Sequence, residues 1–203
     1  MQFLELKVSP KYLQRGGVAI QRTETITHGA AATRQLIMAF YSPGEHDKSW
    51  VNKLVVMCSK NPYSHCELIF DNGLATSIMH GENIFCKKRT FASENYTFKG
   101  FNVSHATHEK IYQYACQESR KNIPFSSSAM LTPVIGWKLS QRSEGTFCSK
   151  YIVEVLQHGG ITWAMNMNAD YSTPSSIFDS IQQEKNVCFS TVPHKLNQLK
   201  LIY

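Results

Sequence analysis

The chain has 203 residues with a formal net charge of +6, and 42% of its residues are hydrophobic against 18% charged. This length suits one core-bearing domain, and the balance of apolar and charged residues excludes a disordered or fibrous class. No stretch approaches the roughly 20 apolar residues of a transmembrane helix, and no basic segment followed by an apolar core marks a signal peptide.

The cysteines and the basic residues narrow the class further. None of the cysteines forms a CxxC pair, so the sequence predicts neither a zinc site nor a disulfide framework. Free cysteines favour a reducing, cytoplasmic compartment. We expect no metal and no cofactor. The basic residues are scattered rather than arranged as a stripe with exposed aromatics, so the sequence predicts no nucleic-acid partner. Weak association with an anionic membrane surface stays open. The cysteines are Cys58, Cys66, Cys86, Cys116, Cys148 and Cys188.

In chain order, residues 1–34 are interpreted as an N-terminal arm or extension, and residues 35–203 as the domain. Gln35–Tyr41 predicts a buried strand stopped by Ser-Pro-Gly, and Asp47–Lys60 predicts a helix behind an Asp47 N-cap. Strands are then expected around His65 and at the ranges 75–79, 84–87 and 98–103.

The second half of the chain predicts helices. One begins with Thr107 as N-cap and ends before Pro124, and a connection from Phe125 to Gly145 leads to a helix that starts at Cys148. A last helix is expected at Thr173–Phe178, with proline in its first turn. Strands followed by helices indicate an α+β fold with a small antiparallel sheet packed by helices.

Cys148 and His65 are the residues with the clearest chemical potential. Cys148 stands where a loop runs into an apolar-periodic helix, and the N–H groups and partial positive charge at a helix start favour a thiolate. His65 lies in a short strand-like run closed by Asp71-Asn72-Gly73, and it is the base available to such a nucleophile.

These two motifs resemble a known family. The strand from Tyr63 to Phe70, its Asn-Gly turn and the helix start Phe147-Cys148-Ser149 are similar to the permuted NlpC/P60 branch of papain-like cysteine hydrolases. That branch includes bacterial amidase-like proteins, the lecithin retinol acyltransferase group and proteins of large DNA viruses, and its histidine strand precedes its cysteine helix. The resemblance covers roughly residues 35–183 and implies Cys148 as nucleophile and His65 as general base.

The third catalytic residue departs from the family pattern, because Ser77 stands where the family usually has a polar residue, often histidine. If Asp71-Asn72-Gly73 is a three-residue loop, Glu67 lies opposite Ser77 and on the face of His65, which favours Glu67 as the orienting group. A two-residue turn would instead place His80 opposite His65. Glu67, Ser77, His80 and a bare dyad therefore remain alternatives.

Other residues are candidates for substrate binding. The hydroxyl of Tyr63 is a candidate second oxyanion donor beside the Cys148 N–H. Four apolar residues are candidates for lining an acyl or peptide cleft: Trp137, Trp163, Met165 and Met167.

The function expected from these observations is that of a cysteine hydrolase, a peptidase or amidase that forms an acyl-enzyme at Cys148. One alternative with the same chemistry is a lipid acyltransferase or phospholipase-like thiol enzyme, so the expected partner is a peptide, amide or lipid substrate. An alternative of another class is a catalytically silent binding module, viral and host-interacting, that keeps the fold.

Overall fold

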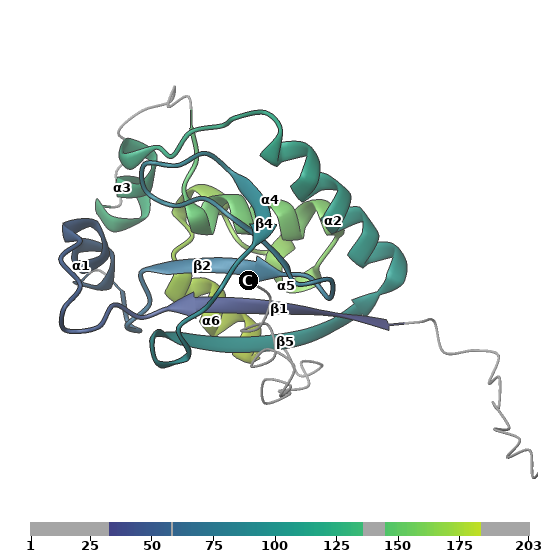
Figure 1. Ribbon diagram of the computed structural model, residues 1–203, viewed down its shortest axis with the longest axis horizontal. Coiled ribbons are helices and arrows are strands. Elements are labelled where there is room, and N and C mark those ends of the chain that lie inside the picture. Colours follow the sequence, from purple (N-terminus) through teal and green to yellow (C-terminus); the bar gives the residue numbers. More distant parts are fainter. Residues whose placement is uncertain (1–32, 58, 136–144, 184–203) are drawn as a thin grey trace, which may run out of the picture. The chain divides into compact units, whose positions relative to one another are not determined.

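The computed structural model describes residues 33–57, 59–135 and 145–183. A five-stranded antiparallel sheet lies at its centre, with the strands in the order β4-β3-β2-β1-β5 (Figure 1). This arrangement confirms the predicted α+β class. The strands are β1 (Thr33–Tyr41), β2 (His65–Ile69), β3 (Leu74–Ser77), β4 (Phe85–Lys88) and β5 (Tyr96–Ser104).

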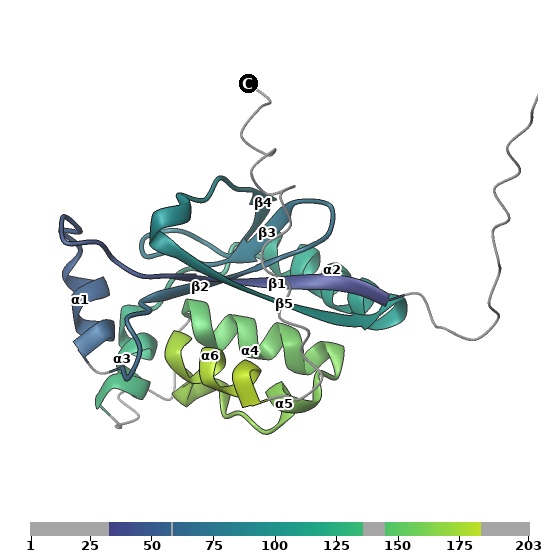
Figure 2. The same cartoon turned by 90° about the horizontal axis from the view of Figure 1, so that it is seen from below.

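Helices cover one face of the sheet, and Figure 2 shows α4, α5 and α6 together on that side. Among the described residues, none of these helices combines the length and the apolar character needed to cross a bilayer. The helices are α1 (Trp50–Met57), α2 (His105–Ser119), α3 (Ser127–Ile135), α4 (Cys148–Gly159), α5 (Thr162–Met165) and α6 (Pro174–Gln183), with short 3₁₀ turns at Ser93–Asn95 and Ala169–Tyr171.

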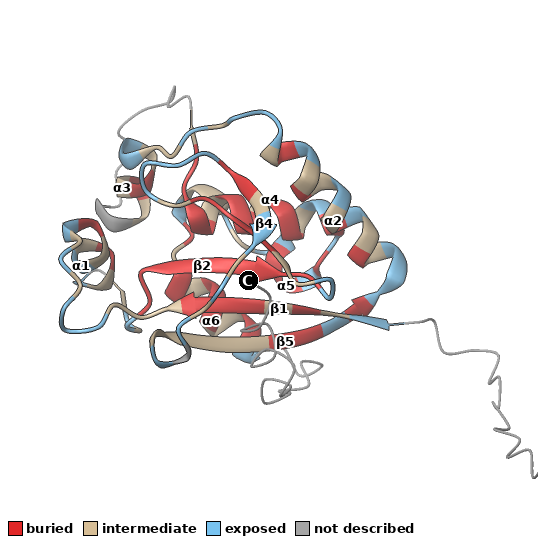
Figure 3. Cartoon of the chain, in the orientation of Figure 1, coloured by how far each residue is buried: buried red, intermediate tan, exposed pale blue. Residues whose placement is uncertain are grey.

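The two faces of the sheet pack against different partners. On β1, Leu36, Met38 and Phe40 point to the helical side and join the main core with residues of α4. On the other face, Ala39 belongs to a small separate cluster against which Phe91 packs. Residues 38–40 of β1 are therefore buried, and β2, the central strand, is buried along its whole length (Figure 3).

The connection from β4 to β5 joins the two edges of the sheet. Because β4 and β5 lie at opposite ends of the strand order, the segment from Arg89 to Asn95 has to cross the sheet, and Figure 1 shows it passing over β2 and β1. Phe91 in this segment packs on the outer cluster. The crossing segment thus takes the place of a helix layer on that face.

The β2–β3 hairpin fixes which residues face each other across the site. Leu68 pairs with Thr76 and Ile69 with Ala75, and Gly73 adopts a positive φ of 80° in the loop. This register leaves Asp71-Asn72-Gly73 as a three-residue loop, as one of the two predicted turns requires. The next pair in this register is Glu67 and Ser77, so the predicted two-residue turn that would pair His80 with His65 is wrong.

Two helix starts differ from the predicted caps. The hydroxyl of Ser49, and not Asp47, accepts the Asn52 N–H at the start of α1, and α1 ends at Met57 rather than at residue 60. The α2 helix is capped by Ser104, which accepts the Thr107 N–H at 3.1 Å. Both sites offered two neighbouring polar side chains, and the choice between them depends on where the preceding segment ends.

The predicted start of α6 is confirmed. Thr173 accepts the N–H of Ser176 through its hydroxyl, and Pro174 occupies the first helical position.

The predicted connection from Phe125 to Gly145 contains a helix that the sequence did not indicate. The α3 helix begins after Ser126, whose hydroxyl accepts the Ala129 N–H, and it includes Pro133. A proline inside a short helix removes one backbone donor and masks the helical pattern in the sequence. Residues 136–144 of the connection lie outside the described residues.

Candidate active site

A cleft of about 490 Å³ opens at the N-terminal end of α4. It contains both Cys148 and His65, together with His80 and with residues of α1 and α3. The lining residues are Tyr41, Ser49, Val51, Asn52, Val55, Ser64, His65, Met79, His80, Glu82, Tyr96, Phe125, Met130, Pro133, Phe147, Cys148, Ser149, Ser172, Thr173 and Pro174.

Cys148 is the first residue of α4, and its side chain belongs to the main core while also reaching the cleft. The preceding residue, Phe147, has an extended backbone and offers no side-chain cap to the helix. The N–H groups of the first helical turn have no intrahelical acceptor. This helix end therefore presents its partial positive charge beside the Cys148 sulfur.

The Cys148 thiol is acidified by its neighbours. A hydrogen bond from the Cys66 thiol, followed by the nearby His65 imidazolium, holds the pKa of Cys148 well below its ordinary value although burial opposes this. Conversely, burial and the Cys148 sulfur raise the pKa of Cys66. Cys148 is thus the more acidic thiol of the two, and the Cys66 thiol is the donor to it.

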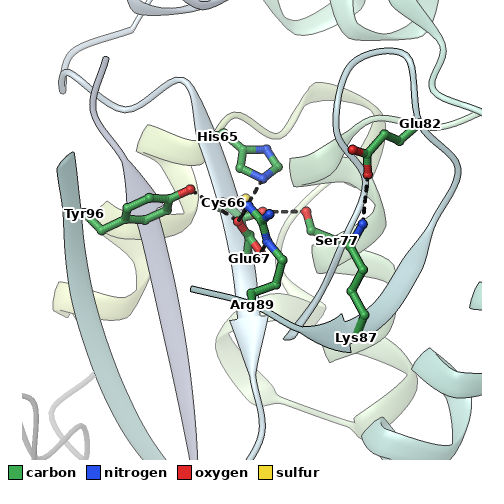
Figure 4. Close-up of polar contacts among 8 residues, drawn as sticks. All are labelled: His65, Cys66, Glu67, Ser77, Glu82, Lys87, Arg89 and Tyr96. Carbon is green, nitrogen blue, oxygen red and sulfur yellow. Dashed lines mark hydrogen bonds and ion pairs between the residues drawn. The ribbon is translucent and has the colours of Figure 1, made fainter. Parts of the chain in front are cut away.

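His65, the first residue of β2, lies between Cys148 and Glu67. Burial alone would lower the pKa of His65, but the Cys148 and Glu67 charges raise it to about 10. Its Nε2 atom lies 3.5 Å from Glu67 Oε1 and has no closer hydrogen-bond partner among the described residues (Figure 4). At this separation the contact is mainly the attraction of an imidazolium for a carboxylate.

Glu67 is a fully buried carboxylate with several donors around it. Arg89 binds both carboxylate oxygens, with Nε 3.2 Å from Oε2 and Nη2 3.1 Å from Oε1, and the Tyr96 hydroxyl donates to Oε1 at 3.4 Å (Figure 4). Burial would raise the pKa of Glu67, but His65 and Arg89 hold it below its usual value. Glu67 is therefore ionised and fixed in position behind the imidazole.

The sequence around Arg89 does not mark it as a site residue. It follows two lysines, a pattern that usually forms a solvated face. The crossing segment between β4 and β5 instead carries its guanidinium onto the outer face of the sheet, where it also lies 5.7 Å from the centroid of the Phe85 ring. The contact between Arg89 and Glu67 becomes evident only once the order of the strands in the sheet is known.

The structure does not bring Tyr63 into the cleft. Its hydroxyl donates to Thr97 Oγ1 at 3.2 Å, and its ring packs between Phe40 and Phe178. The prediction that Tyr63 is an oxyanion donor is therefore wrong, because its side chain packs in the core against α6. The chain direction just before β2 turns the tyrosine to the helical side of the sheet.

Ser77 and His80 are also not in contact with the His65 imidazole. The buried Ser77 hydroxyl donates to the backbone carbonyl of Cys66 at 2.7 Å (Figure 4). His80 lines the cleft, but its ring packs edge-on against Phe125 at 5.3 Å between centroids. Of the predicted alternatives, Glu67 is the one that lies beside His65.

We expect Ser77→Ala to leave the reactivity of Cys148 within about twofold, because the serine stabilises the hairpin and touches neither nucleophile nor base. The lost buried hydrogen bond should lower the free energy of unfolding by about 1 kcal/mol. Urea unfolding and the rate of Cys148 alkylation measure the two effects. A tenfold slower alkylation with unchanged stability would return Ser77 to the catalytic set.

The apolar wall of the cleft comes from elements other than the predicted ones. Val51 and Val55 of α1 pack with Met130 of α3 and with Phe147 in a cluster of their own. The expected lining residues Trp163, Met165 and Met167 are absent from the cleft, and Trp137 lies outside the described residues.

No protein-family model matches this chain, and no curated protein matches it.

Proposed function

We propose that this protein is a cysteine hydrolase of the peptidase or amidase kind, which forms an acyl-enzyme at Cys148. The observation that carries the proposal is the order of groups at the floor of the cleft. An acidified thiol lies beside an imidazole, and a buried, ionised carboxylate lies behind that imidazole. This is the set of groups that nucleophilic catalysis by cysteine requires.

The acylation step uses the thiolate and the imidazolium together. The Cys148 sulfur attacks the substrate carbonyl carbon, and the N–H groups at the start of α4 stabilise the negative charge that develops on the oxygen. As the carbon–nitrogen bond breaks, His65 transfers its proton to the departing amine. Water then attacks the thioester and gives its proton to His65, which releases the acid and restores the thiolate.

Glu67 sets the direction of the proton transfer. Because Nε2 of His65 faces the carboxylate, Nδ1 is the nitrogen that exchanges its proton with the substrate side. The carboxylate also favours the imidazolium, since it raises the pKa of His65. Arg89 acts on the reaction only through Glu67, as a positioning residue, whereas Tyr96 both donates to Glu67 and lines the cleft.

The fold supports the same proposal. In a permuted papain-like arrangement the strand with the base precedes the helix with the nucleophile, and β2 precedes α4 here, with the two elements packed together. The antiparallel sheet and the helix layer on one of its faces also suit that arrangement.

Selective alkylation tests the proposal directly. With limiting iodoacetamide near pH 6, we expect Cys148 to be modified at least about tenfold faster than the other cysteines, because its lowered pKa keeps it a thiolate. His65→Ala should raise the pKa of Cys148 and move the onset of alkylation to higher pH. Peptide mass mapping over a pH series measures both effects.

His158→Ala is the matched control, because this histidine stacks on Tyr114 at the far end of α4 and does not line the cleft. It should leave the alkylation profile unchanged. Uniform slow labelling of all cysteines, independent of His65, would support the silent binding module instead.

A lipid acyl substrate is a second candidate, favoured by the apolar wall of the cleft. Val51, Val55 and Met130 present only hydrocarbon and thioether surface, which suits an acyl chain. Intact-mass analysis after incubation with peptide and phospholipid mixtures separates the two, because the mass added to Cys148 identifies the acyl group.

A further inference from the structure

The α1 helix exposes two large apolar side chains to solvent. Trp50 is 62% exposed and Met57 is 81% exposed, although side chains of this type are usually covered. They stand seven residues apart with the exposed Lys53 between them, a spacing that puts all three on one side of a helix. This stripe, Trp50–Lys53–Met57, is the outer face of α1.

The outer face of α1 is not required for the core. The opposite side of the helix supplies Val51 and Val55, which are buried and line the cleft. Figure 3 shows buried and exposed segments along the same short helix. A helix that is apolar on its inner side and carries an exposed tryptophan and methionine on its outer side has a second apolar surface to cover.

Basic residues outnumber acidic ones around the outer face. Lys48 precedes the helix, Lys53 lies within the stripe and Lys60 follows the helix, and all three are exposed. Two acids lie near these lysines: Glu45 is exposed, and Asp47 accepts hydrogen bonds from the Ser49 N–H, the Asn52 amide and the Tyr41 hydroxyl, which hold its pKa below the ordinary value and keep it negatively charged. The outer face therefore complements a negatively charged partner.

We propose that the outer face of α1 docks this protein on an anionic lipid bilayer, with Trp50 and Met57 in the headgroup region and the lysines over the lipid phosphates. Tryptophan prefers this interface, and basic residues beside an apolar stripe are typical of helices that lie on a membrane surface. Two apolar side chains bury far less than the roughly 800 Å² per partner of a stable protein interface. Binding to a bilayer does not require a large preformed contact area, because lipid headgroups and chains rearrange around a few inserted side chains.

Docking through α1 would bring the cleft close to lipid. The inner side of the same helix lines the cleft, so the cleft lies about one helix diameter, roughly 10 Å, from the docked surface. The proposal does not depend on the reaction at Cys148, since binding to vesicles is measured without turnover.

Co-sedimentation of the full chain with vesicles provides the test. We expect binding to vesicles of phosphatidylcholine with about 30% phosphatidylserine to exceed binding to pure phosphatidylcholine at least about tenfold, and to be lost in high salt. Lys53→Glu reverses one charge and should weaken binding roughly tenfold or more, at about 1 kcal/mol for each charge unit. The double variant Trp50→Ala, Met57→Ala should weaken it by a similar factor.

Met165→Ala is the control, because this methionine is 59% exposed on α5 and should not change binding. Alkylation of Cys148 in each variant verifies that the fold and the cleft are intact. Tryptophan emission adds a readout on the unmodified protein: vesicles should shift it to shorter wavelength, and Trp50→Phe should remove the shift.

Two results would overturn the proposal. Equal binding to neutral and anionic vesicles, or unchanged binding in both α1 variants, would show that the outer face does not bind lipid. Self-association in gel filtration that the double variant abolishes would identify a second copy of the chain as the occupant instead.

Discussion

Replacing Cys148 with alanine is expected to lower turnover at least about 10⁴-fold while the protein stays folded, because the variant lacks the attacking atom but keeps the helix and sheet around it. A small buried thiol contributes only about 1 kcal/mol of packing, so the free energy of unfolding should change little. Release of 4-nitrophenol from 4-nitrophenyl acetate measures the rate, and urea unfolding measures the stability.

Cys116→Ala is the control for this loss, since Cys116 is a partly buried free thiol on α2 and does not line the cleft. Its rate should equal that of the unmodified protein. If Cys148→Ala unfolds, or if the esterase rate persists in it, the thiol is a core residue and the proposed nucleophile is wrong.

Glu67→Gln is expected to slow acylation about 10³-fold with little change in KM. The amide keeps the volume of the side chain and one acceptor oxygen for Arg89, but it no longer carries the charge that attracts the His65 imidazolium. Since the carboxylate raises the pKa of His65, its removal lowers that pKa, and the upper limb of the pH–rate profile moves from about 10 to lower pH. The pH dependence of kcat/KM measures this shift.

Glu82→Gln provides the matched comparison, because Glu82 is a cleft carboxylate that pairs with Lys87 at 3.3 Å and does not shift the pKa of His65. The upper limb of the pH–rate profile of this variant should stay at the same pH. If Glu67→Gln leaves the upper limb of the pH–rate profile in place, and its lower rate is accompanied by a lower free energy of unfolding, then Glu67 has only a structural role in the sheet.

The local parts of this site were predictable from sequence. The turn residues Asp71-Asn72-Gly73 limited the hairpin to two registers, and the period of two along β2 put His65 and Glu67 on the same face in either one. Proline and threonine before α6 marked its start in the same local way. Each of these predictions depends on a few consecutive residues and on backbone geometry.

The long-range parts were not predictable by the same means. Arg89 reaches Glu67 because β4 and β5 lie at opposite edges of the sheet, and strand order is not encoded in any short window. The apolar wall from α1 and α3 depends on helix packing, and the helix containing Pro133 does not show a regular apolar period. Tyr63 illustrates the reverse error, since proximity in sequence to His65 suggested a shared role that its packing does not support.

The crossing segment from Arg89 to Asn95 and the start of β5 link the surroundings of Cys148 to the pairing of both edge strands. Glu67 lies on the central strand β2, yet its charge is balanced by Arg89, which follows one edge strand, and it accepts a hydrogen bond from Tyr96, which begins the opposite edge strand. If the segment that carries Arg89 detaches, the buried carboxylate loses the cation that binds both of its oxygens, and its position behind the imidazole is no longer fixed. Loosening these contacts would therefore weaken the His65 influence on the pKa of Cys148 and leave the influence of Cys66 in place.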